Sequence, residues 1–273
     1  MDKKRFIFFG AHPDDPDILF GGTAYKLAKA GHSVKFVSVT NGDSGHFNMK
    51  REELAAARAV EAQRSAEVLG IAEYEIFPLH DGELEPTVEN RKRVIRCIRE
   101  FKPDVVLTHR LCDYHPDHRA TAQLVLDSAY MITVPLCCPE VPVPETIPVF
   151  AYSFDRFIHP RPQRADAAIE IDSVIDIKAA AMANHCTQFY EWLPWVEDGD
   201  KDFDVTKLNE EERKNHIMKW NQRFRIAADN GRETLKKVYG EEMGSGVVYA
   251  ETFEQSDYSR QLPVEEFQAL LMP

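Results

Sequence analysis

The first part of the chain alternates short apolar runs with stretches of helix-forming residues. Residues 6–10 and 34–39 are the first two apolar runs, and both are predicted to be buried strands. Residues 23–30 lie between them, contain helix formers and are followed by Gly31, a residue typical of a helix C-terminus. The order of strand, helix and strand predicts a parallel pair of strands.

The same alternation continues beyond this first unit. Residues 51–69 are rich in alanine, glutamate and arginine and stop at Gly70, so they predict a helix. Residues 74–79 predict a strand, residues 89–101 a helix with one apolar face, and residues 105–107 another buried strand. Repeated alternation of this kind predicts an α/β fold, with a doubly wound, mostly parallel sheet and helices on both faces.

The second half has a less regular pattern. A proline-rich connection covers residues 135–148. The pattern then predicts strands at 149–154 and 167–171, a helix at 173–189, a loop at 191–204, a long polar helix to about 238 and a strand at 247–253. We interpret residues 1–273 as one α/β domain, with an extension from about residue 190 whose role the sequence leaves unassigned.

Charge and composition narrow the range of partners and compartments. With 33 basic and 45 acidic side chains the formal charge is −12, which disfavours binding to nucleic acid or to an anionic membrane surface. The five cysteines form no C-x-x-C pair, so they favour a reducing cytoplasm over a disulfide framework. The first apolar run is too short for a signal peptide, and no stretch approaches the roughly 20 apolar residues of a membrane span. We therefore expect a cytoplasmic protein.

Histidine and aspartate side chains directly follow two of the predicted strands. The first group is His12, Asp14 and Asp15, and the second is His109, Asp113, His115, Asp117 and His118. In a doubly wound sheet, ligands bind at the carboxyl ends of the strands. A catalytic zinc ion takes three imidazole or carboxylate ligands and keeps one position open. His12, Asp15 and a histidine from the second group therefore predict a metal site.

The remaining side chains of the two groups suggest acid and base chemistry. His115 and His118 are three residues apart, so on a helix both could face one cavity, one binding metal and the other handling protons. Asp14 is placed to take a proton from water. An aspartate after a strand is also a common helix N-cap, and a lone histidine is often structural. The joint occurrence of both groups favours a metal site.

Five segments together resemble the LmbE-like, PIG-L-type N-acetylglucosamine deacetylases. They are AHPDDPDILFGGT at 11–23, TNGDSGH at 40–46, the helix that carries Arg58 and Glu61, KPDVVLTH at 102–109 and HPDH at 115–118. A fainter likeness continues through Ile171, Asp172, Lys178, His185 and Gln188. The first 130 residues or so thus carry most of the resemblance.

The resemblance implies a Rossmann-like fold and one divalent metal ion, zinc or alternatively iron, held by His12, Asp15 and His118. It implies Asp14 as general base, and His115 as a charged imidazole that stabilises the oxyanion or helps to protonate the leaving amine. It also implies that Asp117 orients a ligand histidine. Weaker candidates for supporting or substrate contacts are Arg58, Asp43 and His185, with a helix-surface or loop-capping role an equal alternative for the first two.

One departure from the family concerns the residues after the aspartate pair. The family has an acidic residue there, whereas this chain has Pro16 followed by Asp17. Proline is tolerated in a first helical turn, so we expect the loop to survive with a rearranged contact behind it.

The sequence predicts zinc-dependent hydrolysis of the N-acyl amide, most simply N-acetyl, of an amino sugar or related small molecule. The expected partner is an N-acylated amino sugar or glycoconjugate, and a homo-oligomer is compatible with the pattern. The alternatives are a metal-dependent esterase or phosphoesterase, and a non-catalytic sugar-binding module of the same fold.

Overall fold

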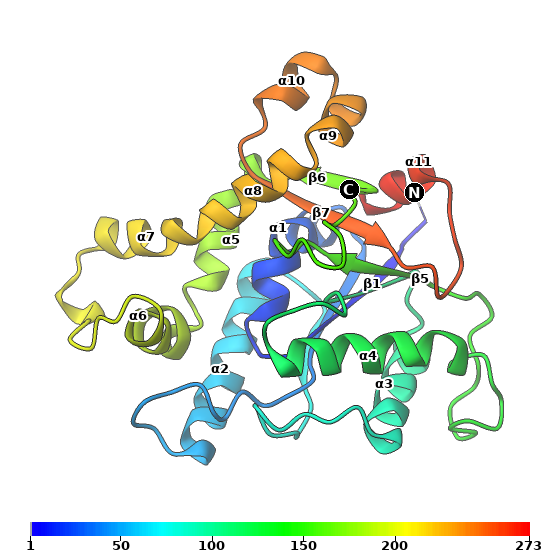
Figure 1. Ribbon diagram of the computed structural model, residues 1–273, viewed down its shortest axis with the longest axis horizontal. Coiled ribbons are helices and arrows are strands. Elements are labelled where there is room, and N and C mark those ends of the chain that lie inside the picture. Colours follow the sequence, from blue (N-terminus) through cyan, green and yellow to red (C-terminus); the bar gives the residue numbers. More distant parts are fainter. Residues whose placement is uncertain (1) are drawn as a thin grey trace.

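The computed structural model describes residues 2–273 and contains a seven-stranded sheet (Figure 1). The strands are β1 Arg5–Gly10, β2 Ser33–Ser38, β3 Glu73–Ile76, β4 Val105–Thr108, β5 Val149–Ser153, β6 Ala167–Glu170 and β7 Ala250–Gln255. Their order across the sheet is β3-β2-β1-β4-β5-β7-β6. The pairs from β3 to β5 are parallel, and β7 runs antiparallel to both β5 and β6. The predicted mostly parallel, doubly wound sheet is confirmed.

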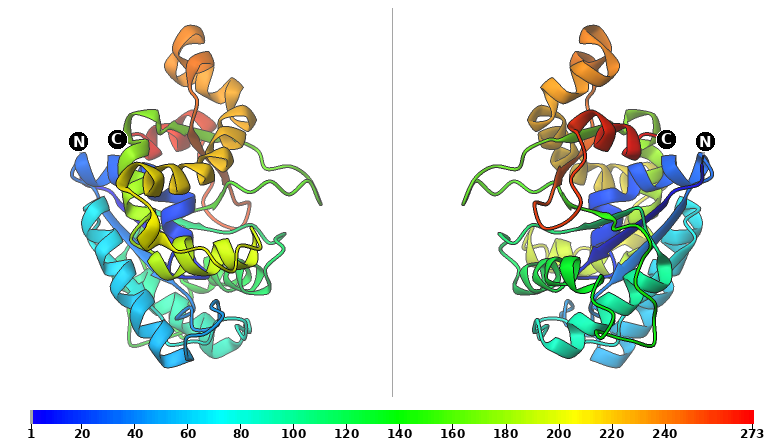
Figure 2. Two further views of the ribbon diagram at one scale, coloured as in Figure 1. Left: turned by 90° about the vertical axis from the view of Figure 1, so that its left-hand side faces the viewer. Right: turned by 90° about the vertical axis from the view of Figure 1, so that its right-hand side faces the viewer.

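Side chains of the central strand β1 alternate between two apolar layers. The helices of these layers are α1 Asp15–Lys29 and α2 Arg51–Leu69 on one face, and α3 Val88–Phe101 and α4 Pro116–Met131 on the other. Phe6 and Phe8 are fully buried in the layer of α1 and α2, and Ile7 and Phe9 in the layer of α3 and α4. Because successive side chains of a strand point to opposite faces, helices cover both sides of the sheet (Figure 2).

Local signals set some helix ends better than others. The bounds of α2 agree with the prediction, and Gly70 ends the helix in the left-handed conformation, with φ of 64°. The helix α1 begins at Asp15 rather than at residue 23. Pro16 fits within its first turn, where a missing N–H costs no internal hydrogen bond.

The second half contains more breaks than the sequence predicts. Its helical segments are α5 Ile175–Met182, a π-helical turn at Thr187–Trp192, α6 Leu193–Val196, α7 Glu210–Met218, α8 Gln222–Asn230, α9 Arg232–Tyr239, α10 Glu241–Gly246 and α11 Val264–Leu271. The prediction of one continuous helix over 173–189 is wrong, because the Glu61 carboxylate of α2 accepts hydrogen bonds from the Thr187 N–H and hydroxyl and starts a new turn there. The predicted loop at 191–204 contains α6, and the predicted long helix is divided into α7, α8 and α9.

Residues beyond 190 contribute to the sheet itself. Strand β7 lies between β5 and β6, where Ala151 pairs with Gln255 and Ala167 pairs with Phe253. Part of the segment left unassigned by the sequence is thus integral to the fold, and the interpretation of the whole chain as one domain stays a prediction. Among residues 2–273, no helix combines the length and apolar character needed to cross a membrane.

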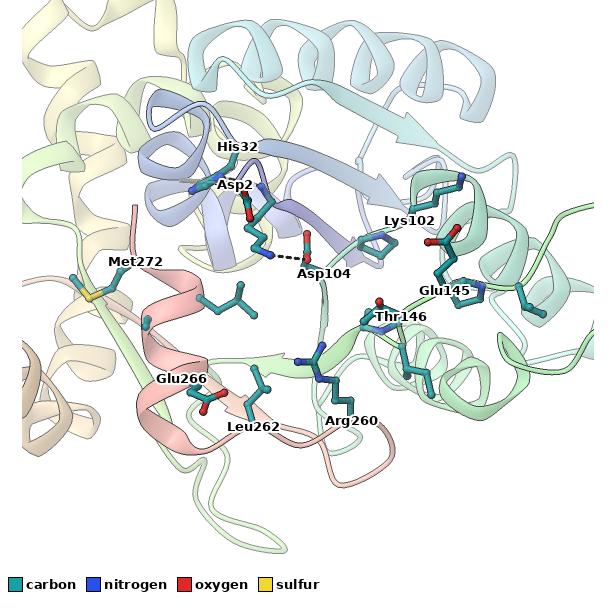
Figure 3. Close-up of a pocket in the computed structure, with 18 of the residues that line it drawn as sticks. Asp2, His32, Lys102, Asp104, Glu145, Thr146, Arg260, Leu262, Glu266 and Met272 are labelled. Carbon is teal, nitrogen blue, oxygen red and sulfur yellow. Dashed lines mark hydrogen bonds and ion pairs between the residues drawn. The ribbon is translucent and has the colours of Figure 1, made fainter.

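A cavity of about 770 Å³ opens at the amino ends of the strands (Figure 3). Lys4 and Asp104, which precede β1 and β4, form an ion pair of 3.5 Å in its wall. The rest of the wall includes residues 142–148 and one side of α11. None of the predicted site residues lines this cavity, because they follow the carboxyl ends of the strands.

Candidate metal and catalytic site

Two loops far apart in sequence meet at the carboxyl edge of the sheet. One follows β1 and carries His12, Asp14 and Asp15, and the other follows β4 and leads into α4. The two strands are hydrogen-bonded neighbours, with Phe9 opposite Thr108, so the loops that leave them are adjacent. His115 is the N-cap residue of α4, which places His118 on the first turn of that helix. The fold therefore brings both groups of polar side chains together.

Three side chains direct donor atoms to a common point. His12 Nδ1 is 3.3 Å from Asp15 Oδ2 and 3.3 Å from His118 Nε2, which in turn is 3.4 Å from Asp15 Oδ1. Tetrahedral zinc with ligand bonds of about 2.0–2.1 Å separates its ligand atoms by roughly 3.3–3.4 Å. The chemistry and the spacing of these donors fit one divalent metal ion. Each of the three side chains is 10–12% exposed, so the site is accessible from one side.

Each histidine of this set has a carboxylate at its other ring nitrogen. His118 Nδ1 lies 3.1 Å from Asp113 Oδ1, and His12 Nε2 lies 3.1 Å from Asp81 Oδ1. Such carboxylates fix the tautomer and the orientation of a metal-binding imidazole. Burial works against a charge on His12, but the surrounding carboxylates, Asp117 foremost, raise its pKa well above the usual range. Burial likewise opposes the charge on Asp81, yet the hydrogen bond to His12 and its field hold the pKa of Asp81 low.

Asp117 was predicted to orient a ligand histidine. In the structure it shares this position with Asp81 at His12, and Asp113 lies against His118. Asp117 Oδ2 is 3.5 Å from His12 Nε2, farther than Asp81, and it accepts a hydrogen bond of 2.6 Å from the Gly82 N–H. Asp81 and Asp113 were not among the predicted site residues. Asp81 follows β3 as the predicted groups follow β1 and β4, so the same rule could have found it. Asp113 lies within the second polar group of the sequence.

Asp14 forms an ion pair with Arg58 of α2. The distance between Arg58 Nη2 and Asp14 Oδ1 is 2.9 Å, and Arg58 Nη1 donates to the Gly42 carbonyl at 3.2 Å. The Arg58 side chain is 2% exposed. The structure therefore places Arg58 behind Asp14, where it orients the carboxylate, and not on the surface of the helix.

His115 lies among the other imidazoles of the site. Its Nδ1 accepts the Asp117 N–H at 3.2 Å, which leaves Nε2 as the other ring atom able to act. Its ring centroid is 4.6 Å from that of His12 and 5.0 Å from that of His118. Burial, followed by the fields of these two imidazoles, lowers the pKa of His115 below 6.5.

His109 is a member of the cluster that sequence reasoning did not select. Its Nε2 accepts the Ala11 N–H at 3.1 Å and lies 3.3 Å from Asp15 Oδ2, and its ring stacks on that of His118 at 4.2 Å. Burial and the neighbouring His118 lower its pKa. Within residues 2–273, the sets with metal-ligand spacing are His12/His115/His118, Asp15/His109/His118 and His12/Asp81/Asp117. The predicted set of His12, Asp15 and His118 is not one of them, but its members are divided between the first two, which share His118.

The carboxylate of Asp17 anchors the turn behind Asp14. It accepts a hydrogen bond from Ser65, and its Oδ2 lies 3.1 Å from both the Tyr74 hydroxyl and His185 Nε2. Tyr74 also donates to the Pro13 carbonyl. His185 and Asp17 are both 0% exposed. His185 therefore supports the loop from behind, out of reach of a substrate. Asp17 is a buried acidic residue directly after Pro16.

Asp43 is likewise a supporting residue in the structure. Its Oδ1 accepts the Asp81 N–H at 3.0 Å and its Oδ2 lies 2.6 Å from His80 Nδ1. The Asp43 side chain is buried, so it holds the Asp81 turn in place. The three weaker candidates, Arg58, Asp43 and His185, thus all contact other protein groups.

Comparison with known proteins adds an independent finding. The family model described as "PIG-L: GlcNAc-PI de-N-acetylase" matches residues 7–129. These residues include both polar loops and the Arg58 helix.

Individual relatives extend the likeness beyond this region. A diacetylchitobiose deacetylase of Thermococcus kodakarensis is 29% identical over 205 residues, which cover 71% of this chain and 74% of that protein. A 4-oxalmesaconate hydratase of Pseudomonas putida is 26% identical over 201 residues, covering 70% and 76%. The structure of an N,N'-diacetylchitobiose deacetylase from Pyrococcus horikoshii superimposes with a TM-score of 0.71 at 22% identity, covering 97% of this chain and 86% of that one. That likeness supports the fold.

Proposed function

Since the PIG-L family model matches residues 7–129, we propose that this protein is a metal-dependent hydrolase that removes an acetyl group from the nitrogen of an amino sugar. The observation that carries the proposal is the contact of His12 Nδ1, His118 Nε2 and the two Asp15 oxygens at 3.3–3.4 Å, beside an independently held Asp14. A catalytic zinc ion with three protein ligands keeps a further position for water or substrate.

In this proposal His12, Asp15 and His118 hold the metal; two imidazoles and one carboxylate form a common catalytic zinc site, with iron as the alternative ion. When bound, the ion would supply Lewis-acid chemistry by lowering the pKa of water and polarising the amide carbonyl. Asp113 and Asp81 keep the two imidazoles oriented from their outer nitrogens.

Proton transfer falls to groups that do not hold the ion. Asp14 accepts a proton from the attacking water, and the Arg58 ion pair keeps its carboxylate aimed at the site. The neutral His115 ring, whose Nδ1 accepts the Asp117 N–H, would donate a hydrogen bond from Nε2 to the acyl oxygen. Asp14 would then pass the proton that it took from water to the departing nitrogen. An amide is a poor electrophile, so both the base and the oxyanion donor are needed.

The substrate class is proposed from the named relatives. A deacetylase of diacetylchitobiose matches most of the chain, and the family model names a GlcNAc conjugate. An N-acetylated glucosamine or a short glycoconjugate of it is therefore the expected substrate.

A direct test measures free amine and acetate over a panel of N-acetylated sugars, with and without a metal chelator. We expect equimolar acetate and amine from at least one N-acetylglucosamine derivative, and no turnover in the chelated protein. Ester or phosphate release without amine release would contradict the proposal and favour an esterase or phosphoesterase.

A hydratase is a second candidate, favoured by one observation. The hydratase relative covers nearly the same share of the chain as the deacetylase relative, 70% against 71%. A hydratase also needs activated water and a base such as Asp14, so the site alone is compatible with both reactions. Loss of the ultraviolet absorbance of the unsaturated tricarboxylate 4-oxalmesaconate, with no amine released from any sugar, would favour the hydratase.

A further inference from the structure

Helix α5 and strand β7 both lie beside α1 (Figure 1), and a charged side chain from each contacts the middle of α1. Lys178 of α5 donates from Nζ to the Ile18 carbonyl at 2.7 Å. Glu251 of β7 accepts the Gly22 N–H at 2.9 Å and the Thr23 N–H at 2.8 Å. The two side chains also form an ion pair with each other, at 0% and 2% side-chain exposure. A buried ion pair therefore contacts the backbone of this helix directly.

The contacts resemble those at helix ends, although they lie inside a helix. In a regular α-helix the N–H of residue 22 would bond to the carbonyl of residue 18. Here the carbonyl also has an ammonium partner and the amide also has a carboxylate partner. Cations suit backbone carbonyls and anions suit backbone amides, so the pair adds charged partners to one turn of the continuous helix α1. This turn directly follows the one that begins at Asp15.

Gly22 is needed for this arrangement. A Cβ at this position would lie 2.6 Å from Ile171 Cγ2 and 3.3 Å from Glu251 Oε1, so any side chain would push both away. The Lys178 ammonium also lies 3.7 Å from the centroid of the Phe224 ring. Packing thus holds the pair in place, and Gly22 allows the backbone of α1 to lie close to Ile171 and Glu251.

The first turn of α1 needs external support. It contains Pro16, which donates no backbone hydrogen bond, and three aspartates, Asp14, Asp15 and Asp17, whose charges repel one another. Among its own backbone bonds are Asp15 N–H to the His12 carbonyl at 3.2 Å and Ile18 N–H to the Asp14 carbonyl at 3.1 Å. Lys178 holds the far end of this turn through the Ile18 carbonyl.

We propose that Lys178 and Glu251 are positioning residues, which hold the first turn of α1 so that Asp14 and Asp15 stay aligned with His118. The inference rests on the proposed metal-dependent function. Lys178 of α5 and Glu251 of β7 touch no substrate. They would nevertheless control the metal affinity and the placement of the base. Loss of the pair would lower metal affinity and kcat more than it changes KM.

Lys26 provides a matched control on the same helix. Its Nζ donates to the Glu170 carbonyl at 2.7 Å and pairs with the Glu170 carboxylate, but it lies on the last turn of α1. The test compares Lys178→Met with Lys26→Met by zinc competition against a chelating dye and by the visible spectrum of the cobalt-substituted protein. We expect Lys178→Met to weaken zinc binding by about 10- to 100-fold and to change the cobalt spectrum. Lys26→Met should leave both unchanged.

Lys178→Met leaves Glu251 without its partner, so a second variant covers a failure to fold. Lys178→Met combined with Glu251→Leu removes both charges, and such a double replacement is commonly tolerated. It should fold and still show weakened zinc binding. Wild-type zinc affinity and an unchanged cobalt spectrum in a folded variant would overturn the inference alone. A wild-type protein that binds neither ion would overturn the proposed function as well.

Discussion

The guanidinium of Arg58 lies 2.9 Å from the carboxylate of Asp14, and both side chains are almost fully buried beside the proposed metal centre. The pair joins α2 to the loop after β1. Asp14 is therefore fixed in orientation although it is not one of the three metal donors. A carboxylate held in this way can work as a base without depending on the metal for its position.

Asp14→Asn should separate metal binding from turnover. The amide keeps the shape of the side chain but cannot take a proton, so we expect a bound metal and a fall in kcat of about 10²- to 10⁴-fold. Metal content by elemental analysis and amine release measure the two properties. Turnover near the wild-type rate would remove Asp14 as the base.

Arg58→Lys should lower kcat by about 10- to 100-fold with little change in zinc affinity, because a lysine cannot hold both Asp14 and the Gly42 carbonyl. Arg64→Lys is the matched control on α2, since Arg64 is exposed. Steady-state kinetics on both variants gives the comparison. Equal losses in the two would mean that the Asp14 contact has no special importance.

Asp113→Asn should weaken zinc binding by about 10- to 100-fold, because the amide orients the His118 ring less firmly. Asp127→Asn on α4 is the control. The Asp127 side chain is 41% exposed and lies 3.8 Å from Arg91. Competition with a chelating dye measures both affinities. An unchanged affinity in the Asp113 variant would show that His118 needs no such partner.

Removal of the metal should lower stability as well as activity. A ligand that binds only the folded state adds about 2.7 kcal/mol at a free concentration of about 100 times its Kd. We expect the Tm to fall on chelation and to return with added zinc, in step with amine release. If neither chelation nor added zinc changed the Tm, a bound ion would not stabilise the folded protein.

His185 should make stability depend on pH. Burial alone would lower its pKa, but Asp17, Asp14 and Glu61 raise it above 6.5, so the folded state favours the protonated ring. Its contribution is complete below about pH 6.5 and is lost as the pH rises through the higher folded-state value. The difference in free energy of unfolding between wild type and His185→Gln should therefore shrink from about pH 6 to about pH 9, by at most about 1.4 kcal/mol per pH unit.

Urea unfolding across that range measures the His185 effect. Using the difference between two proteins cancels the titration of the other imidazoles. A difference that stays constant with pH would indicate that folding does not change the pKa of His185.

The parts of the fold that were predicted correctly depend on local signals. The bounds of α2 follow from residue preferences and from Gly70, and the strands β1, β2 and β4 follow from short apolar runs. The meeting of His12 and Asp15 with His118 follows from one topological rule about the carboxyl ends of parallel strands. These predictions need no knowledge of distant contacts.

The parts that were missed depend on tertiary contacts. The break before Thr187 is caused by Glu61, which is 126 residues earlier in the chain. The support that Asp81 gives to His12 likewise joins two loops: the position of Asp81 after β3 can be read from the sequence, but its contact with His12 cannot. The sequence left Arg58 and His185 open between supporting and substrate contacts, because burial cannot be read from residue type alone.

The place of β7 between β5 and β6 has a consequence for biosynthesis. The strand comes last of the seven along the chain, yet it is interior to the sheet. A nascent chain that has not reached residue 250 has β5 and β6 with open edges, and unpaired edges invite contacts with other chains. Glu251 also lies on this strand. Until β7 has inserted into the sheet, we therefore expect the nascent chain to depend on chaperones and to be unable to retain metal.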